Sequence, residues 1–497
     1  MNRTDKCRKA KAGLLLIASP RFKNLSGPKR GTYGERKDKA VKEIKATMED
    51  FLDLVDPGIV YERQDAERAL KLFFDEGVDF VYAEFLSWSE DFAWIRFLRD
   101  CPQMPIIFCN VARPRMSFET TLDEDDFVDY LCAGTLVGSL EGSGSLKRVP
   151  RENVRTVLGT REQITEKVRI FADAARTRTI LRHSNVGLMA NMNEAMWSTY
   201  FDNYDLFTKI GPEIHYLPYS DYGIEIDNLT DEEVKAYADE LASKYKMMPD
   251  VEYDKFIGCV KATLGIKKLA EKNDIDCYVY NDIDQATFRI AGCRAGFYPQ
   301  WFNENVCVLV PEADIGAGLA TFVLKLLSGK NVNFIEPFHI EDDFGTFAGG
   351  HAGPNDHNDP AWQDNVVISR DVRFAKTSWK YAGAPFAWYR ISPGMKTVAG
   401  IYEQDGRYKL ITFLAESLDA KDTPQSKIKH LLATYSHTIF RPVVPAKELF
   451  EQILRIGATQ HFAIVDGDYT AQLQDFAEIM GFDFYYIIFN FRYFKFK

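Results

Sequence analysis

Residues 306–351, VCVLVPEADIGAGLATFVLKLLSGKNVNFIEPFHIEDDFGTFAGGH, contain the pattern that decides the fold. The apolar run CVLV at 307–310 is followed by a Gly/Ala-rich helical run from 315 to 327. A second apolar run, VNFIE, then leads to Glu336. A buried strand, a helix and another buried strand in this order are typical of an α/β protein.

Two acids and a histidine in this stretch are candidate metal ligands. Glu312 follows the first apolar run, Glu336 ends the second, and His351 follows a Gly-rich loop. Carboxylates at strand ends with a histidine nearby suit a divalent cation. The alternative is that Glu312 caps the helix N-terminus, Glu336 is a solvated strand end and His351 is a loop histidine. Spacing alone leaves both interpretations open.

Length and composition predict a soluble globular protein with more than one domain. A chain of 497 residues is too long for a single core, and 46% hydrophobic and 27% charged residues are ordinary proportions. The net charge of −11 argues against a general nucleic-acid binder, which needs a basic face. We therefore expect no nucleic-acid partner.

The cysteines and the apolar runs indicate a cytoplasmic protein. None of the eight cysteines forms a CxxC pair, and scattered thiols are typical of a reduced core rather than a disulfide framework. No apolar run approaches the roughly 20 residues of a membrane span, so we expect no membrane partner. The apolar stretch near the N-terminus is too short for a signal sequence and predicts a first buried strand.

Strands and helices alternate in the first third of the chain. The runs at 13–18, 78–85 and 104–111 are largely apolar, and helical patterns lie between them. This alternation predicts a parallel sheet with helices on both faces. Residues 35–54 have a helical pattern, and the small residues from 134 to 144 predict a loop.

The pattern of apolar and polar residues changes twice further along the chain. A second alternation begins at 184–191, with a helical segment expected at 192–209, and no GxGxxG motif or P-loop indicates a nucleotide cofactor. After Gly345, short alternating runs separated by Gly, Pro and Asp favour an antiparallel barrel or sandwich. The predicted fold is two Rossmann-like α/β domains, at 1–180 and 181–335, followed by a β-rich, barrel-like C-terminal domain at 336–497.

Three segments carry a more specific pattern: PEADIGAG at 311–318, NFIEPF at 333–338, and IGATQHFAIVDGDYTAQLQDFAEIMGFD at 456–483. They resemble the L-arabinose isomerase / L-fucose isomerase superfamily of aldose–ketose isomerases, and the resemblance in length and domain order covers nearly the whole chain. It implies four metal ligands, which are Glu312, Glu336, His351 and His461. Two carboxylates with two histidines match the arabinose-type branch, whereas the interval between the acids is closer to the fucose-type branch.

The resemblance implies an activity. A superfamily member interconverts an aldose and a ketose, here a pentose or 6-deoxyhexose, through a metal-stabilised ene-diolate with Glu312 and Glu336 as acid and base. Carboxylates with imidazole suit Mn²⁺, with Mg²⁺ or Co²⁺ as alternatives. Relatives assemble as trimers or hexamers, so a homo-oligomer with a small-molecule sugar substrate is expected.

Two other functions stay open. One is a non-catalytic sugar-binding or regulatory protein on the same scaffold, although four retained ligand positions and a β-rich C-terminal domain argue against it. The other is a different metal-dependent ene-diol enzyme. Ala313 stands where arabinose isomerases have Gly, and the first strand–loop, SPRFKNLSGPKRG, lacks their substrate-contact pattern.

The remaining polar residues near these motifs have ordinary interpretations. Asp314 is expected to cap the helix or to support a ligand rather than to bind metal. His339 and His357 are alternative ligands. The other histidines are expected at the surface or in the core, and they are His183, His215, His430 and His437.

Overall fold

A computed structural model describes residues 6–116, 118–149, 151, 153–371, 383–423 and 438–488. Its chain divides into two compact units. The N-terminal unit consists of Cys7–Thr179 and Gln474–Gly481, and the larger unit contains Ile180–Leu473 together with Lys6 and residues 482–488. The domain limits at 180 and 335 stay predictions. Within the described ranges, every helix is too short or too polar to cross a lipid bilayer.

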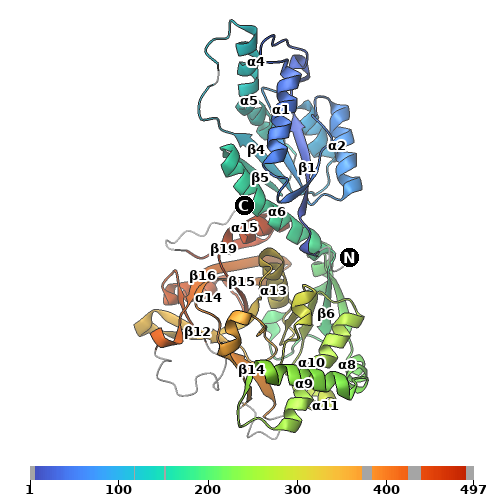
Figure 1. The fold of residues 1–497 in the computed structure, drawn as a ribbon, viewed down its shortest axis with the longest axis vertical. Helices are drawn as coiled ribbons and strands as arrows, with labels where there is room; N and C mark the ends of the chain where they lie inside the picture. Colours follow the sequence, from blue (N-terminus) through green and yellow to red (C-terminus); the bar gives the residue numbers. More distant parts are fainter. Residues whose placement is uncertain are drawn as a thin grey trace. The chain divides into compact units, whose positions relative to one another are not determined.

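The N-terminal unit contains a five-stranded sheet in the order β2-β1-β3-β4-β5, and every neighbouring pair is parallel. Its strands are β1 (Ala10–Ile17), β2 (Leu52–Val55), β3 (Phe80–Phe85), β4 (Ile106–Val111) and β5 (Val154–Gly159). The helices in Figure 1 that accompany this sheet are α1 (Tyr33–Ala46), α2 (Arg63–Glu76), α3 (Phe92–Asp100), α4 (Glu124–Ala133), α5 (Thr135–Leu146) and the first part of α6 (Arg161–Arg182).

Helices cover both faces of this sheet, as predicted. Every residue of β3 is buried, and successive side chains point to opposite faces. Phe85 packs against Trp94 of α3 on one face, and Phe80 packs edge-to-face against Phe171 of α6 on the other. A strand buried on both faces is mostly apolar, which is why the run at 78–85 was recognisable. The buried acid of β3, Glu84, is compensated by Arg161.

The prediction of a helix over 35–54 is partly wrong. Helix α1 ends at Ala46, and Leu52–Val55 form β2, the edge strand that pairs with β1. The strand is only four residues long, and the helical sequence pattern of α1 continues into it, so the strand could not be recognised from the sequence. Pairing with β1 overrides the helical preference of these residues.

The loop predicted at 134–144 is also wrong, because residues 135–144 belong to helix α5 and only its N-cap, Gly134, lies outside the helix. Gly138 and Gly142 lie directly over the ring of Phe85, and an added Cβ would come within 2.9 and 2.6 Å of it. The small residues therefore permit close approach of the helix to the sheet, and they do not mark a turn.

The larger unit contains a second parallel sheet, in the order β10-β9-β6-β7. Its strands are β6 (Asn185–Met189), β7 (Glu213–Leu217), β9 (Cys277–Tyr280) and β10 (Val308–Val310). The longer helices of this region are α8 (Tyr219–Asp227), α9 (Asp231–Lys244), α10 (Tyr253–Lys272) and α13 (Ile315–Ser328). The last of these follows β10 and is buried along almost its whole length.

The continuous helix expected at 192–209 does not form. The segment contains a 3₁₀ turn at Trp197–Thr199, the short α7 (Asn203–Asp205) and a π turn at Leu206–Ile210. The side chains of Asn193 and Asp202 accept hydrogen bonds from backbone N–H groups two or three residues later. Such local bonds compete with helical pairing and interrupt it.

The C-terminal region contains a closed six-stranded barrel, which confirms the barrel prediction. Around the barrel the order is β15-β18-β11-β12-β17-β16, and pairing of β15 with β16 closes it. The strands are β11 (Asn333–Glu341), β12 (Thr346–Gly350), β15 (Gly394–Gln404), β16 (Arg407–Ser417), β17 (Thr438–Pro442) and β18 (Phe462–Asp466). The predicted runs that became β13 (Val366–Arg370) and β14 (Pro385–Tyr389) lie instead in a separate small sheet with β8 (Lys246–Met247).

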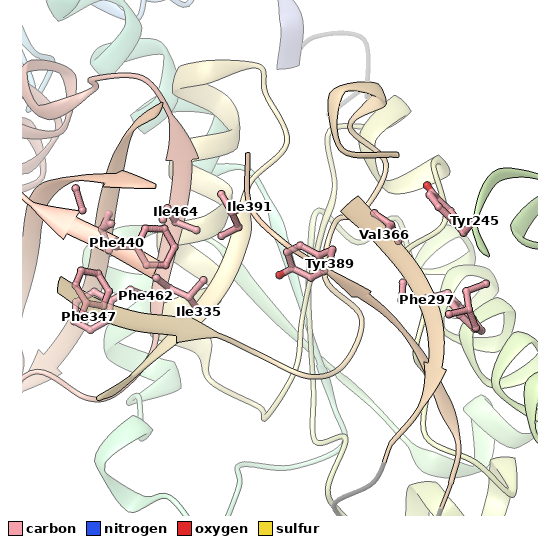
Figure 2. Packing of buried hydrophobic residues seen from close by; sticks show 14 of the residues in the cluster. Tyr245, Phe297, Ile335, Phe347, Val366, Tyr389, Ile391, Phe440, Phe462 and Ile464 are labelled. Carbon is pink, nitrogen blue, oxygen red and sulfur yellow. The ribbon is translucent and has the colours of Figure 1, made fainter. Parts of the chain in front are cut away.

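Aromatic and aliphatic side chains fill the barrel. Phe347 of β12 stacks on Phe440 of β17 with 5.1 Å between ring centroids, and Phe413 of β16 packs edge-on against Phe347. Figure 2 shows Phe347, Phe440, Phe462, Ile335 and Ile464 gathered between the strands that carry them. This core holds the strands that position the site described below.

Asp475 is a buried acid of helix α15 (Thr470–Met480), in the part of that helix that belongs to the N-terminal unit. Its carboxylate lies 3.5 Å from Nε of Arg155, whose Nη1 also pairs with Glu478 at 2.7 Å. Burial raises the pKa of Asp475 to about 7. The folded state therefore favours the protonated acid, and stability is lost as the pH rises from the ordinary pKa of an aspartate through 7.

Replacing Asp475 by Asn should consequently stabilise the protein more at pH 8 than at pH 5, by about 1–3 kcal/mol. Urea unfolding followed by circular dichroism at the two pH values measures the difference. Glu478→Gln, which removes the more exposed acid beside the same arginine, serves as the control. An equal effect of Asp475→Asn at both pH values would contradict the expected ionisation.

Candidate metal centre

Four side chains from separate segments of the larger unit meet at one point. Glu312, Glu336, His351 and His461 each offer a ligand atom, and these atoms all lie within 4.8 Å of one another. Nε2 of His351 is 3.1 Å from Oε1 of Glu312, and Nε2 of His461 is 3.2 Å from Oε2 of the same carboxylate. Glu336 lies 3.8 Å from His351 and 3.5 Å from His461.

The barrel brings these residues together. Glu336 is the fourth residue of β11 and is paired with Gly350, so His351, which directly follows β12, is its neighbour. His461 directly precedes β18, which pairs with β11 on the other side. Glu312 comes from the connection between β10 and α13. Strand order, rather than distance along the chain, decides the composition of the site.

Phe334 packs against both histidines. Its ring centroid is 4.6 Å from that of His351 and 4.6 Å from that of His461. The Asn355 side chain accepts a hydrogen bond from the Phe334 N–H and donates one to the Phe334 carbonyl, both at 2.9 Å. The loop that follows His351 thus returns to hold Phe334, and the ring limits how the imidazoles can turn.

The site is largely shielded from water. His461 and His351 are 0 and 1% exposed and Glu312 is 8% exposed, whereas the Glu336 side chain is 24% exposed. Burial alone would raise the pKa of Glu312, but the hydrogen bond with His351 and the charge of the nearby His461 imidazole hold it well below its usual range. Burial alone would lower the pKa of His461, but Asp314 and Glu312 raise it. Two acids thus face two imidazoles over a few ångströms.

The donor set fits a divalent cation. In the described part of the chain, the buried Nε2 of His461 has no hydrogen-bond partner, although it faces the carboxylates of Glu312 and Glu336. Mn²⁺, Mg²⁺ or Co²⁺ would bind such a nitrogen lone pair and two carboxylates that are directed at one point. The group contains no cysteine thiolate, the ligand that is typical of structural zinc sites.

Asp314 has both roles that the sequence predicted for it. Oδ1 accepts the Ala317 N–H at 2.9 Å and caps α13, while Oδ2 lies 2.7 Å from Nδ1 of His461. A carboxylate on Nδ1 fixes the imidazole tautomer and leaves Nε2 free to bind a metal. The Tyr402 hydroxyl donates to the His461 carbonyl at 3.0 Å and holds the backbone as well.

Asp314→Asn should weaken Mn²⁺ binding by about 10–100-fold, because the amide oxygen can serve either the helix cap or His461, but not both. Isothermal titration of the metal-free protein measures the affinity. Asp284→Asn is the matched control, since Asp284 caps α11 (Gln285–Ala291) through Ala286 and is not part of the ligand group. Comparable losses in both variants would mean that capping alone matters.

The alternative histidines lie outside the ligand group. His339 is 54% exposed and 3.6 Å from Glu341. Nε2 of the buried His357 accepts the Tyr298 N–H at 3.1 Å, and burial lowers its pKa to about 3, so it is a neutral structural residue. The exposed His183 and the partly buried His215 also stand apart. The predictions for His430 and His437 lie outside the described residues.

The sequence did not reveal two residues that hold the backbone of Glu312. Asp282 accepts the Glu312 N–H at 2.9 Å, and Asn193 donates to the Glu312 carbonyl at 3.3 Å. A signal was available for Asp282, because the acidic segment NDID directly follows the apolar run CYVY of β9. Parallel strands end at the same edge of a sheet, so acids after β9 and β10 are neighbours.

Comparisons with known proteins do not place the chain in a family. Neither the models of known protein families nor the curated proteins include a match to it. What the protein does must therefore be inferred from its fold and from this candidate metal centre.

Proposed function

We propose that the protein is a metal-dependent aldose–ketose isomerase of the L-arabinose isomerase / L-fucose isomerase superfamily, acting on a pentose or 6-deoxyhexose. The observation that carries the proposal is the convergence of Glu312, Glu336, His351 and His461. Three short motifs contain Glu312, Glu336 and His461, the resemblance adds His351 after the Gly-Gly pair at 349–350, and the fold brings these side chains to one point. With the superfamily come further expectations: Rossmann-like topology of both parallel sheets, assembly as a homotrimer or hexamer, and a cytoplasmic location.

Isomerisation moves a proton between C1 and C2 of the open-chain sugar. The chemistry that Mn²⁺ (or Mg²⁺ or Co²⁺) supplies in such a site is polarisation of the carbonyl and stabilisation of the ene-diolate charge. His351 and His461 would hold the ion, with Asp314 fixing the tautomer of His461. The two glutamates remain to hold the ion and to relay the proton.

The two carboxylates are not equivalent. Both oxygens of Glu312 lie within 3.2 Å of an imidazole nitrogen, so its lone pairs are already engaged. Glu336 is more exposed and lies farther from both imidazoles. A general base must reach the proton that it removes, and an engaged carboxylate is a poor base. We assign to Glu336 both removal of the C2 proton and its return to C1, whereas Glu312 would hold the cation that stabilises the ene-diolate charge.

The test is an isomerisation assay with EDTA-stripped protein, to which Mn²⁺ is added back over a panel of pentoses and 6-deoxyhexoses. Ketose formation should require Mn²⁺ and should be lost in His351→Gln. His339→Gln, on the exposed part of β11, is the matched control and should retain activity. Mn²⁺ binding without turnover of any sugar would indicate a different ene-diol enzyme, and an absence of metal binding would reject the site.

A further inference from the structure

The backbone at Glu312 has an unusual conformation. Glu312 and Ala313 are consecutive non-glycine residues with φ of +66° and +55°, in the left-handed region. A Cβ atom makes this region unfavourable, and such residues persist only where their surroundings hold them. The conformation matters because it sets the direction in which the Glu312 carboxylate leaves the chain.

Three hydrogen bonds hold this turn. The Asp282 carboxylate accepts the Glu312 N–H at 2.9 Å, the Tyr280 carbonyl accepts the Ala313 N–H at 3.0 Å, and the Asn193 amide donates to the Glu312 carbonyl at 3.3 Å. Asp282 is the one charged partner among them. Its negative charge strengthens the bond to the N–H in a region that water does not reach.

Arg294 compensates the buried negative charge of Asp282. Nε of Arg294 donates to Oδ2 of Asp282 at 2.7 Å, and Nη2 donates to the same oxygen. The Asp282 carboxylate is thus divided, with Oδ2 serving the arginine and Oδ1 the turn. The Arg294 side chain is 2% exposed, and its guanidinium lies 5.3 Å from the centre of the Phe386 ring. Neither Asp282 nor Arg294 belongs to the ligand group.

We propose that Asp282 and Arg294 are positioning residues that hold Glu312 in its ligand conformation before a metal binds. The inference rests on the proposed metal centre, but not on the sugar chemistry. Without Asp282 the turn at Glu312–Ala313 is free to relax, and metal binding must restore it. The cost then appears as weaker metal binding.

The experiment combines Asp282→Asn with Ala313→Gly, because glycine adopts the left-handed region without penalty. An asparagine oxygen cannot serve both Arg294 and the Glu312 N–H, so Asp282→Asn should weaken Mn²⁺ binding by about 10–100-fold. In the wild type, Ala313→Gly should leave the Mn²⁺ affinity unchanged. In the Asp282→Asn background, the same substitution should raise the Mn²⁺ affinity about threefold or more. Isothermal titration of Mn²⁺ into the four metal-free proteins measures this.

Melting temperatures of the same four proteins without metal give an independent readout. The effect of Ala313→Gly on the melting temperature should be more stabilising in the wild type, where the turn is held left-handed, than in Asp282→Asn, where the turn relaxes. Unchanged Mn²⁺ affinity in Asp282→Asn, or a loss that glycine does not reduce, would overturn the proposal. If Asp282→Asn does not fold, Arg294→Lys keeps the charge, loses the planar fork and should still weaken binding about tenfold. A wild type that binds no Mn²⁺ would refute the proposed function, while the melting temperatures would still test the turn.

Discussion

Glu312→Gln should abolish Mn²⁺-dependent isomerisation, with a fall of at least about a thousandfold in kcat/KM. Glu312 faces both imidazoles at 3.1 and 3.2 Å, and its charge lies in a largely buried site. An amide of the same shape removes the negative charge and one acceptor, so the cation loses its central ligand. Turnover over a range of Mn²⁺ concentrations measures the loss, and excess metal should not restore full activity.

The matched control is Glu225→Gln. Glu225 is also 8% exposed and belongs to the same unit, but it pairs with Lys272 on α10 and is not part of the ligand group. Its substitution should leave Mn²⁺ affinity and turnover within about twofold of the wild type. If Glu312→Gln kept most of its activity, Glu312 would not be a metal ligand and the metal centre would have to be sought elsewhere.

Phe347→Ala should destabilise the larger unit by about 3–5 kcal/mol. Phe347 is fully buried in the barrel, where it stacks on Phe440 and contacts Phe413 and Phe450. Removing the ring loses its transfer energy and leaves a cavity among rigid strands. Because β12 leads into His351, we also expect weaker Mn²⁺ binding in this variant. Urea unfolding of the metal-free protein measures the first effect, and titration measures the second.

Phe344→Ala is the control for this substitution. Phe344 lies in the turn between β11 and β12 and is 56% exposed, so its truncation should change the unfolding free energy by less than about 0.5 kcal/mol. Equal losses in Phe344→Ala and Phe347→Ala would mean that the barrel interior is not the source of the stability.

The parts of the fold that local patterns control were predictable. Strands such as β3 are buried on both faces and are therefore mostly apolar, and the alternating runs after Gly345 indicated a barrel or sandwich. Two of the four gathered side chains, Glu312 and Glu336, follow or end apolar runs and were visible as strand-end residues. His351 was noted after a Gly-rich loop, which the structure shows to be strand β12. His461 lies 149 residues after Glu312, and only the resemblance indicated it.

What was missed depends on contacts between distant segments. Gly138 and Gly142 resemble loop residues until the ring of Phe85 is placed against them. Asp282 looks like an ordinary acid after a strand until Arg294 and the Glu312 N–H are found beside it. In each case the chemistry of the residue is visible in the sequence, but its partner is not, because strand order and helix packing decide which segments become neighbours.

The position of His461 has a consequence for synthesis on the ribosome. Glu312, Glu336 and His351 emerge first, but His461 arrives directly ahead of β18, the strand that pairs with both β15 and β11. A nascent chain cannot bring all four proposed ligands together until that strand has been translated and paired. If the proposed metal centre forms, we therefore expect full coordination only late in synthesis.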